Sequence, residues 1–394
     1  MNRRDLLRYL PAVPLGALAG RLFAAPAAGA KLLVVFLRGG YDAATLLVPI
    51  SSQFYYQVRP NIAVPRPGAD PDSSIELDTN WGLHPALRDT MYPLFQKKEA
   101  AFVPFAGIDD VSRSHFETQD SIELGQTLNR SRNFQSGFLN RLAAVLNGAR
   151  PIAFTDQLPL VFRGDALVPN IALRAIGKPG LDAKQRGIIA DMYNGTPLAT
   201  QINEGFDVRD EVMHEMAGEM EAANRNAINT KGFELEARRI AKLMQEKFDI
   251  GFVDVGGWDT HVGQGGAAGY LAGRLEELGR GLVAFADGMG PAWSNTAVVV
   301  ISEFGRTFRE NGNRGTDHGH GTVYWLLGGA LRGGRVAGEQ VRLTQETLFQ
   351  DRDYPVLNEC RAVLGGLFTR MYGLSPGQLD RVFSGVPPKD IGLV

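Results

Sequence analysis

The sequence predicts an α/β protein whose central sheet is mainly parallel and lies between layers of helices. Four short runs are continuously apolar and rich in Val, Ile and Phe, which is typical of strands buried on both faces of a parallel sheet. Stretches with helical periodicity separate these runs, as the crossover connections of such a sheet require. The predicted strands are KLLVVFL (31–37), AAFVPFA (100–106), FDIGFVDV (248–255) and TAVVVIS (296–302).

The predicted helices carry apolar residues at intervals of three and four. They cover residues 84–99, 115–126, 137–146, 208–247 and 271–289. Between them, residues 149–206 are rich in Pro, Gly and Asn and are predicted to form an irregular insertion. The chain has 394 residues, 44% hydrophobic content and no Pro/Ser-rich linker, so we expect a single domain over 31–394.

Residues 1–30 have the features of an export signal. Arg3 and Arg4 lie in a charged segment that precedes an apolar stretch and Ala-rich cleavage sites. The arginine pair favours the twin-arginine route, so the expected partner is that export machinery and the expected location is the periplasm or cell surface. The apolar stretch is short and interrupted, so we expect no stable membrane span in the mature chain.

Charge and cysteine content exclude two further classes. The chain has a net charge of −2, and removal of the leader takes away four arginines and one acid, which argues against nucleic acid as a partner. Cys360 is the single cysteine, so no internal disulfide can form. It lies in a helical pattern and is interpreted as a small buried hydrophobic residue.

Acids and histidines follow the predicted strands, where the loops of a parallel sheet converge on one crevice. Carboxylates and imidazoles suit Zn²⁺, Mn²⁺ or a related dication, and two ions about 4 Å apart can clamp a phosphoryl-type transition state. The sequence therefore predicts a site for one or two divalent metal ions; the alternative is a set of solvated loop side chains. The candidate ligands are Asp42, Asp259, His261, Glu303, His318 and His320.

The residues before the second predicted helix have two interpretations. The S-x-x-E pattern from Ser114 to Glu117 is that of a capping box, which satisfies N–H groups of the first turn. The same position suits a catalytic hydroxyl, because a helix N-terminus beside a dication favours deprotonation and attracts a substrate anion. Arg113 or Arg38 would then contact that anion. His115 is either a ligand, a base or a structural hydrogen-bonding group.

Several motifs, taken in order, resemble the bacterial exported family known as domain of unknown function 1501. This family is grouped with the alkaline phosphatase and sulfatase superfamily. The resemblance covers nearly the whole mature chain and implies a mainly parallel sheet with a metal site at the carboxyl ends of its strands. Besides the leader, the motifs are VVFLRGGYDAATLLVP, FYYQVRPNIAVP, WGLHPAL, RSHFETQD, GWDTHVGQ, ISEFGRT and GTDHGHG.

The resemblance also implies roles for individual residues. Phe304 departs from the pattern, because the superfamily has His or Asn there, and no Cys-x-Pro-x-Arg signature is present, which argues against formylglycine chemistry. By position, the resemblance matches Asp42 to the metal-binding aspartate that follows the first strand, and Asp259 and His261 to ligands of the second metal site. It matches Glu303 to the aspartate that follows a late buried strand, and His318 or His320 to the final histidine ligand. It matches Ser114 to the nucleophile.

Two functions are consistent with these observations. The first is an exported metal-dependent hydrolase or transferase that acts on phosphate or sulfate esters of a small molecule, glycan or lipid. The alternative is a non-catalytic periplasmic or cell-surface binding protein that keeps the fold and a partial metal site. The arginines and Ser114 near the acids favour the enzyme, whereas Phe304 favours the binding protein.

Overall fold

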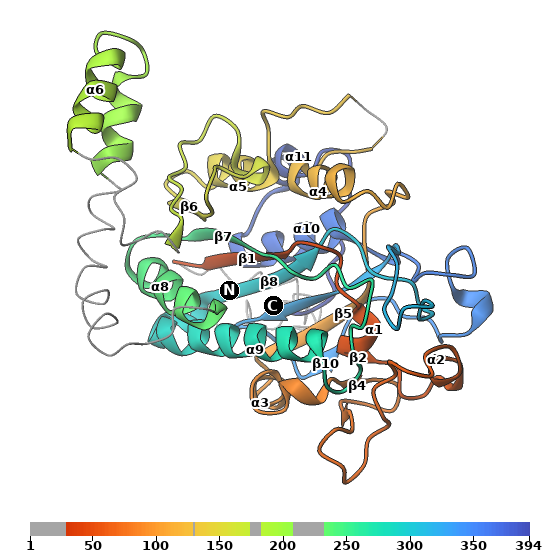
Figure 1. Ribbon diagram of the computed structural model, residues 1–394. Coiled ribbons are helices and arrows are strands. Elements are labelled where there is room, and N and C mark those ends of the chain that lie inside the picture. Colours follow the sequence, from red (N-terminus) through yellow and green to blue (C-terminus); the bar gives the residue numbers. More distant parts are fainter. Residues whose placement is uncertain (1–28, 129–130, 174–182, 208–231) are drawn as a thin grey trace, which may run out of the picture.

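The computed structural model describes residues 29–128, 131–173, 183–207 and 232–394 (Figure 1). A central sheet carries helices on both faces, which confirms the predicted α/β class with a mainly parallel sheet. The predicted leader lies outside the described residues except for its last two positions. Among the described residues, no helix combines the length and apolar character that a membrane crossing needs.

The central sheet has eight strands in the order β10-β5-β9-β8-β1-β7-β6, and β11 also pairs with β5. Its pairs are parallel except those made by β9, which runs antiparallel to β5 and β8. The strands are β1 (Lys31–Leu37), β5 (Ala100–Gly107), β6 (Pro151–Phe154), β7 (Ile250–Val255), β8 (Thr296–Ser302), β9 (Thr322–Leu327), β10 (Arg335–Val336) and β11 (Asn358–Glu359). A small antiparallel sheet contains β2 (Leu47–Val48), β4 (Gly82–Leu83) and β3 (Ile75–Glu76).

The helices form a layer on each face of the central sheet (Figure 1). One layer contains α3 (Met91–Gln96), α8 (Phe233–Glu246) and α9 (Tyr270–Met289). The other contains α4 (His115–Leu124), α5 (Phe138–Val145), α10 (Cys360–Tyr372) and α11 (Pro376–Val382). The remaining helices are α1 (Ala43–Leu46), α2 (Gln53–Val58) and α6 (Ala183–Tyr193), with short 3-10 turns η2 (Pro85–Leu87), η3 (Leu160–Phe162), η5 (Gly290–Asn295) and η6 (Gln345–Thr347).

Strand β1 lies at the centre of the sheet and explains the apolar runs of the sequence. Its Leu33 and Val35 pack into the core shared with α8 and α9, whereas Leu32 and Val34 pack into the core on the opposite face. Successive side chains of a strand point to opposite faces, so a strand covered on both sides is apolar at every position. All four predicted strands are present, as β1, β5, β7 and β8.

Two strands differ from the sequence-based expectation. The segment predicted to be irregular contributes β6, whose four buried residues extend the sheet beyond β7. The antiparallel strand β9, also buried throughout, was not predicted. Because β9 is reversed, its amino end lies at the sheet edge where the parallel strands have their carboxyl ends.

His84 joins the small sheet to the start of α9. Its Nδ1 accepts a hydrogen bond from the N–H of Ala86 at 3.1 Å, and its Nε2 lies 2.9 Å from the carbonyl oxygen of Gly266. A carbonyl only accepts, so Nε2 carries the proton of a neutral imidazole. Burial lowers the pKa of His84 to about 4.

We expect His84 to make the protein less stable in mild acid. The unfolded chain binds this proton near pH 6.5 and the folded chain only near pH 4, so stability falls as the pH drops through this interval, by about 3 kcal/mol. Urea unfolding of wild type and His84→Asn between pH 7 and 4 measures the effect. Asparagine keeps an acceptor for Ala86, and the variant should have the flatter pH dependence. Parallel curves for the two proteins would contradict this assignment.

Candidate functional site

Three imidazoles and one carboxylate meet at the carboxyl edge of the central sheet. The Nε2 atom of His318 lies 2.9 Å from Nε2 of His115 and 3.1 Å from Nε2 of His261. The Oδ1 atom of Asp259 is 2.9 Å from Nε2 of His261 and 3.4 Å from that of His318, and its Oδ2 is 3.6 Å from Nε2 of His115. We call His115, Asp259, His261 and His318 the histidine cluster.

The topology of the sheet brings these four residues together. His115 begins α4 beyond β5, whereas Asp259 and His261 follow β7. His318 precedes the reversed strand β9 and therefore returns to the same edge. Convergence of the strand-end loops was the basis of the sequence prediction, and the described structure places these four predicted residues side by side.

The Nδ1 atom of each imidazole, which points away from the cluster, faces an atom that can only accept a hydrogen bond. The Nδ1 atoms of His115, His318 and His261 lie 2.7 Å from Glu303 Oε1, 3.0 Å from the Arg113 carbonyl and 3.3 Å from Asp317 Oδ1, respectively. Each Nδ1 therefore carries a proton when the ring is neutral, and each Nε2 carries a lone pair. Three lone pairs and a carboxylate then face one another across hydrogen-bonding distances, and Arg306 Nη1 also lies 3.4 Å from Nε2 of His261.

Such a donor set fits a divalent cation. Facing lone pairs repel one another unless a proton or a cation lies between them. Burial and the nearby His115 and Arg306 lower the pKa of His318, which disfavours a proton at this position. A histidine that ligates a metal through one nitrogen and donates from the other to a carboxylate or carbonyl is the usual arrangement in metal sites. His115, Asp259 and His318 each offer a ligand atom, and these atoms lie within 4.8 Å of one another.

Glu303, predicted to be a ligand, instead orients His115. Its fully buried carboxylate lies against His115 Nδ1 and also accepts from Gln119 Nε2 at 2.9 Å, the Gly39 N–H at 2.8 Å and Ser302 Oγ at 2.9 Å. Burial opposes ionisation, but the hydrogen bonds from His115, Gln119 and backbone hold the pKa of Glu303 below its usual value. The carboxylate is thus ionised and already occupied by donors.

Arg306 fixes Asp259 and was not singled out from the sequence. Its guanidinium is inaccessible to solvent, contacts Asp259 Oδ1 and donates to the carbonyl oxygens of Gly39, Gly40 and Thr316. Burial alone would raise the pKa of Asp259, whereas Arg306 holds it below the usual value. A buried arginine therefore keeps the cluster carboxylate ionised and in place.

Two glycines after β1 allow the loops to approach this closely. A Cβ atom on Gly39 would lie 2.6 Å from the backbone nitrogen of Asp259, and one on Gly40 would lie 2.5 Å from the ring of Phe304. Both glycines also have positive φ angles, 126° and 58°, which side chains disfavour. The Phe304 ring in turn packs against His115 and His318, with centroid distances of 4.8 and 5.1 Å. Phe304 is thus an apolar support for the imidazoles.

Asp42 does not lie with the histidine cluster, contrary to the sequence prediction. Its buried carboxylate forms a two-pronged ion pair with Arg59 and accepts from Thr45 at 2.7 Å and Gln264 at 2.6 Å. Burial opposes ionisation, but Arg59 and these hydrogen bonds hold the pKa of Asp42 below its usual value. Both oxygens of Asp42 therefore accept hydrogen bonds from side chains of the protein.

His320 also lies apart from the cluster. Its ring is buried and packs against Phe349 at a centroid distance of 4.7 Å, and burial lowers its pKa. The i, i+2 spacing predicted that His318 and His320 share one side of an extended segment. Gly319 between them packs closely on the backbone of Arg306, where a Cβ would come within 2.4 Å. The two rings therefore belong to different surroundings.

Ser114 and Arg113 lie at the start of α4, beside the cluster residue His115. The predicted capping box is absent, because the Ser114 side chain makes no capping hydrogen bond. The Arg113 side chain pairs with Asp353 at 2.7 Å, and its backbone, at a φ of 53°, presents to His318 the carbonyl described above. Arg113 thus orients a cluster histidine through its backbone. Its side chain shares the Asp353 carboxylate with Arg352, whose Nη1 lies 3.3 Å from Asp353 Oδ2.

The sequence was compared with known proteins. The family model described as "Protein of unknown function (DUF1501)" matches residues 30–383. The chain belongs to this family. The match confirms the resemblance to this family over residues 30–383. No curated protein matches the sequence significantly.

Similar solved structures share little sequence with this family member. The structure of Ps i-CgsB in complex with k-i-k-neocarrahexaose has a TM-score of 0.40 and 10% identity, and the match covers 93% of this chain and 76% of that chain. A protein in the alkaline phosphatase superfamily from Vibrio parahaemolyticus has a TM-score of 0.34 and 13% identity. That match covers 76% of this chain but only 60% of the Vibrio chain.

We expect the histidine cluster to bind Zn²⁺, with about one ion per chain. His318→Ala should lose this ion, because it removes the imidazole that contacts both other rings. Glu303→Gln should bind it about 10- to 100-fold more weakly, because the substitution weakens the hydrogen bond that orients His115. Elemental analysis and competition with a chelator measure both effects.

His320→Gln is the matched control, since this histidine lies two residues from His318 but outside the cluster. It should retain the zinc content of wild type. Equal zinc content in wild type and His318→Ala would show that the cluster is not the metal site.

Proposed function

We propose that the protein is an exported metal-dependent hydrolase or transferase that acts on phosphate or sulfate esters. The observation that carries this proposal is the convergence of three imidazole lone pairs and the Asp259 carboxylate at the ligand-binding edge of an α/β sheet. A bound dication would supply Lewis-acid polarisation of an ester oxygen. An imidazole-rich donor set favours Zn²⁺ over Mn²⁺.

The exposure of the cluster supports a catalytic over a purely structural site. The side chains of Asp259 and His261 are 45% and 41% exposed, whereas Glu303 and Arg306 behind them are inaccessible. Structural zinc sites are closed by four protein ligands, whereas catalytic sites have three and keep a position open to substrate. Among the described residues, those whose ligand atoms lie within 4.8 Å of one another are three, His115, Asp259 and His318. One side of the cluster is therefore rigid, and the other is open to a ligand.

We propose a single metal ion in place of the two that the sequence also allowed. Among the residues that the structure describes, one group of acids and histidines is arranged to hold an ion. Asp42 and Glu303, which a second site would need, are occupied by hydrogen-bond donors from the protein.

The chain offers Ser114 as the candidate nucleophile. Its hydroxyl makes no capping hydrogen bond, and it precedes the cluster residue His115. It lies at the amino end of α4, whose dipole favours a substrate anion. The arginines first considered for that anion are already paired, Arg113 with Asp353 and Arg38 with Asp254 and Glu123.

This pairing of the arginines is the observation that favours the alternative, a non-catalytic binding protein of the periplasm or cell surface. A hydrolase of dianionic esters usually presents an uncompensated cation to its substrate. In either case, export by the twin-arginine route remains part of the proposal, and it rests on the leader sequence of residues 1–30.

An ester panel tests the enzyme proposal. Aryl phosphates, aryl phosphodiesters and aryl sulfates are offered to zinc-loaded protein. We expect turnover of at least one class, a loss of at least about 100-fold in kcat/KM for His318→Ala, and no change for His320→Gln. Ser114→Ala should be inactive if the hydroxyl attacks, and should keep its activity if water attacks. No turnover of any ester by zinc-loaded wild type would contradict the enzyme and favour the binding protein.

A further inference from the structure

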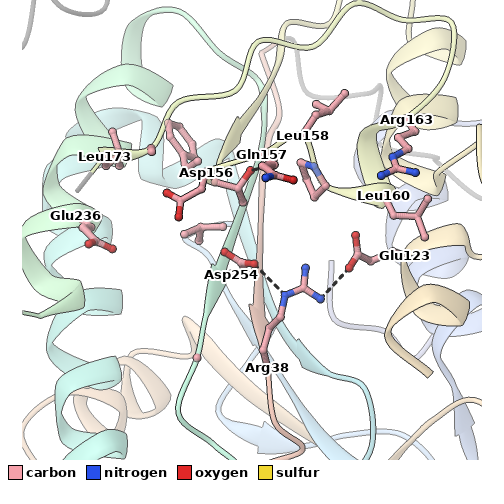
Figure 2. Close-up of a pocket in the computed structure, with 16 residues that line it drawn as sticks. Arg38, Glu123, Asp156, Gln157, Leu158, Leu160, Arg163, Leu173, Glu236 and Asp254 are labelled. Atoms are coloured by element: carbon pink, nitrogen blue, oxygen red, sulfur yellow. Dashed lines mark hydrogen bonds and ion pairs between the residues drawn. The ribbon is translucent and has the colours of Figure 1, made fainter. Parts of the chain in front are cut away.

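A cavity of about 510 Å³ lies at the carboxyl ends of β6 and β7 (Figure 2). Its walls come from the ends of β6 and β7, from α4 and from the segment around η3. Gly256 lines it, three residues before Asp259 of the cluster.

The arginine at the base of the cavity has its charge cancelled. Arg38 Nε donates to Asp254 Oδ2 at 2.9 Å, and Arg38 Nη1 lies 2.8 Å from Glu123 Oε1 (Figure 2). The other Glu123 oxygen accepts the N–H of Val161 at 3.0 Å. Together with Arg163, Asp156 and Glu236, these side chains give the cavity lining two cations and four carboxyl groups. The lining therefore has no surplus of cations and does not suit a phosphate or sulfate group.

Hydrogen-bonding groups nevertheless remain available next to this ion pair. Within the part of the chain that the structure describes, Nη2 of Arg38 and Oδ1 of Asp254 make no hydrogen bond, and the two side chains meet at the cavity floor (Figure 2). The Gln157 side chain lies above them in the same view. A guanidinium donor beside a carboxyl acceptor matches neighbouring hydroxyl groups, because each hydroxyl both donates and accepts.

Apolar side chains line the cavity around these polar groups. Phe154, Pro159 and Leu160 contribute to the wall, and Leu158 is 36% exposed at its margin. Apolar walls with a few placed polar groups are typical of small-ligand sites, and the volume lies in their usual range. A sugar ring has this dual chemistry, since its C–H face is apolar and its rim carries neutral hydroxyls.

The cavity is joined to the cluster by hydrogen bonds. Nη1 of Arg38 donates to Gln119 Oε1 at 2.9 Å, and Gln119 Nε2 donates to Glu303, which orients His115. The base of the cavity and the cluster therefore share one fixed framework.

We propose that this cavity binds a neutral sugar unit, so that the ester substrate is a carbohydrate phosphate or sulfate. The binding of the sugar rests on the cavity alone. Its place in a substrate rests on the hydrolase proposed above.

The test separates sugar binding from catalysis. Wild-type protein is applied to an array of neutral and sulfated oligosaccharides, and the neutral disaccharide that binds best is titrated calorimetrically. Asp254→Asn should bind it about tenfold more weakly, as expected for the loss of one charge-assisted hydrogen bond. Leu158→Trp, which fills the cavity mouth and leaves the ion pair of Arg38 in place, should abolish binding. Asp287→Asn, at an exposed position of α9, is the matched control and should bind as wild type does.

Binding without turnover of any ester would reject the hydrolase and keep this assignment. Turnover of aryl esters without binding to any oligosaccharide would reject the sugar site and keep the hydrolase. Wild-type affinity in both Asp254→Asn and Leu158→Trp would also overturn the assignment.

Discussion

The arrangement of the site depends on one buried cation, the guanidinium of Arg306. Its contacts with Gly39 and Gly40, with Asp259 and with Thr316 join the loops after β1 and β7 to the loop between β8 and β9. A buried charge that loses its partners costs several kcal/mol, so these loops cannot separate without that penalty. The protein therefore assembles the edge of the sheet around a charge of its own. The carboxylate that faces solvent is held by the same contact.

Each imidazole of the histidine cluster is oriented by a hydrogen bond to a different part of the chain. Glu303 extends from the end of β8, the Arg113 carbonyl precedes α4, and Asp317 lies in the loop before β9. Phe304 supports two of the rings from the apolar side. Orientation of this kind lowers the cost of binding a ligand, because the donors need no rearrangement. The position at which the sequence departs from the superfamily pattern is thus occupied by a support for two imidazoles.

The sequence was sufficient to predict the buried parallel strands and the edge at which the reactive side chains gather. Continuous apolar runs report burial on both faces, and sheet topology then places the loop residues after each strand. What failed depended on contacts between distant segments. The hydrogen-bond partners of Asp42 and Glu303 are set by tertiary packing. The spacing of residues along the sequence does not show that these two carboxylates already accept hydrogen bonds from the protein. His318 and His320 diverge because Gly319 packs against Arg306, a contact that an extended-segment rule does not contain.

The reversed direction of β9 has a consequence for how this edge of the molecule can change. Because β8 and β9 are antiparallel neighbours, the loop between them leaves and re-enters the sheet at the same edge, with Glu303 near one end and His318 near the other. Its exposed tip is Gly312, because the carbonyls of Asn313 and Arg314 accept hydrogen bonds from the backbone of Gly263 and Gln264. The entropy of closing a loop grows only slowly with its length. Insertions at this tip can therefore diversify the surroundings of the site, and hence its selectivity, while the two anchored residues keep their positions.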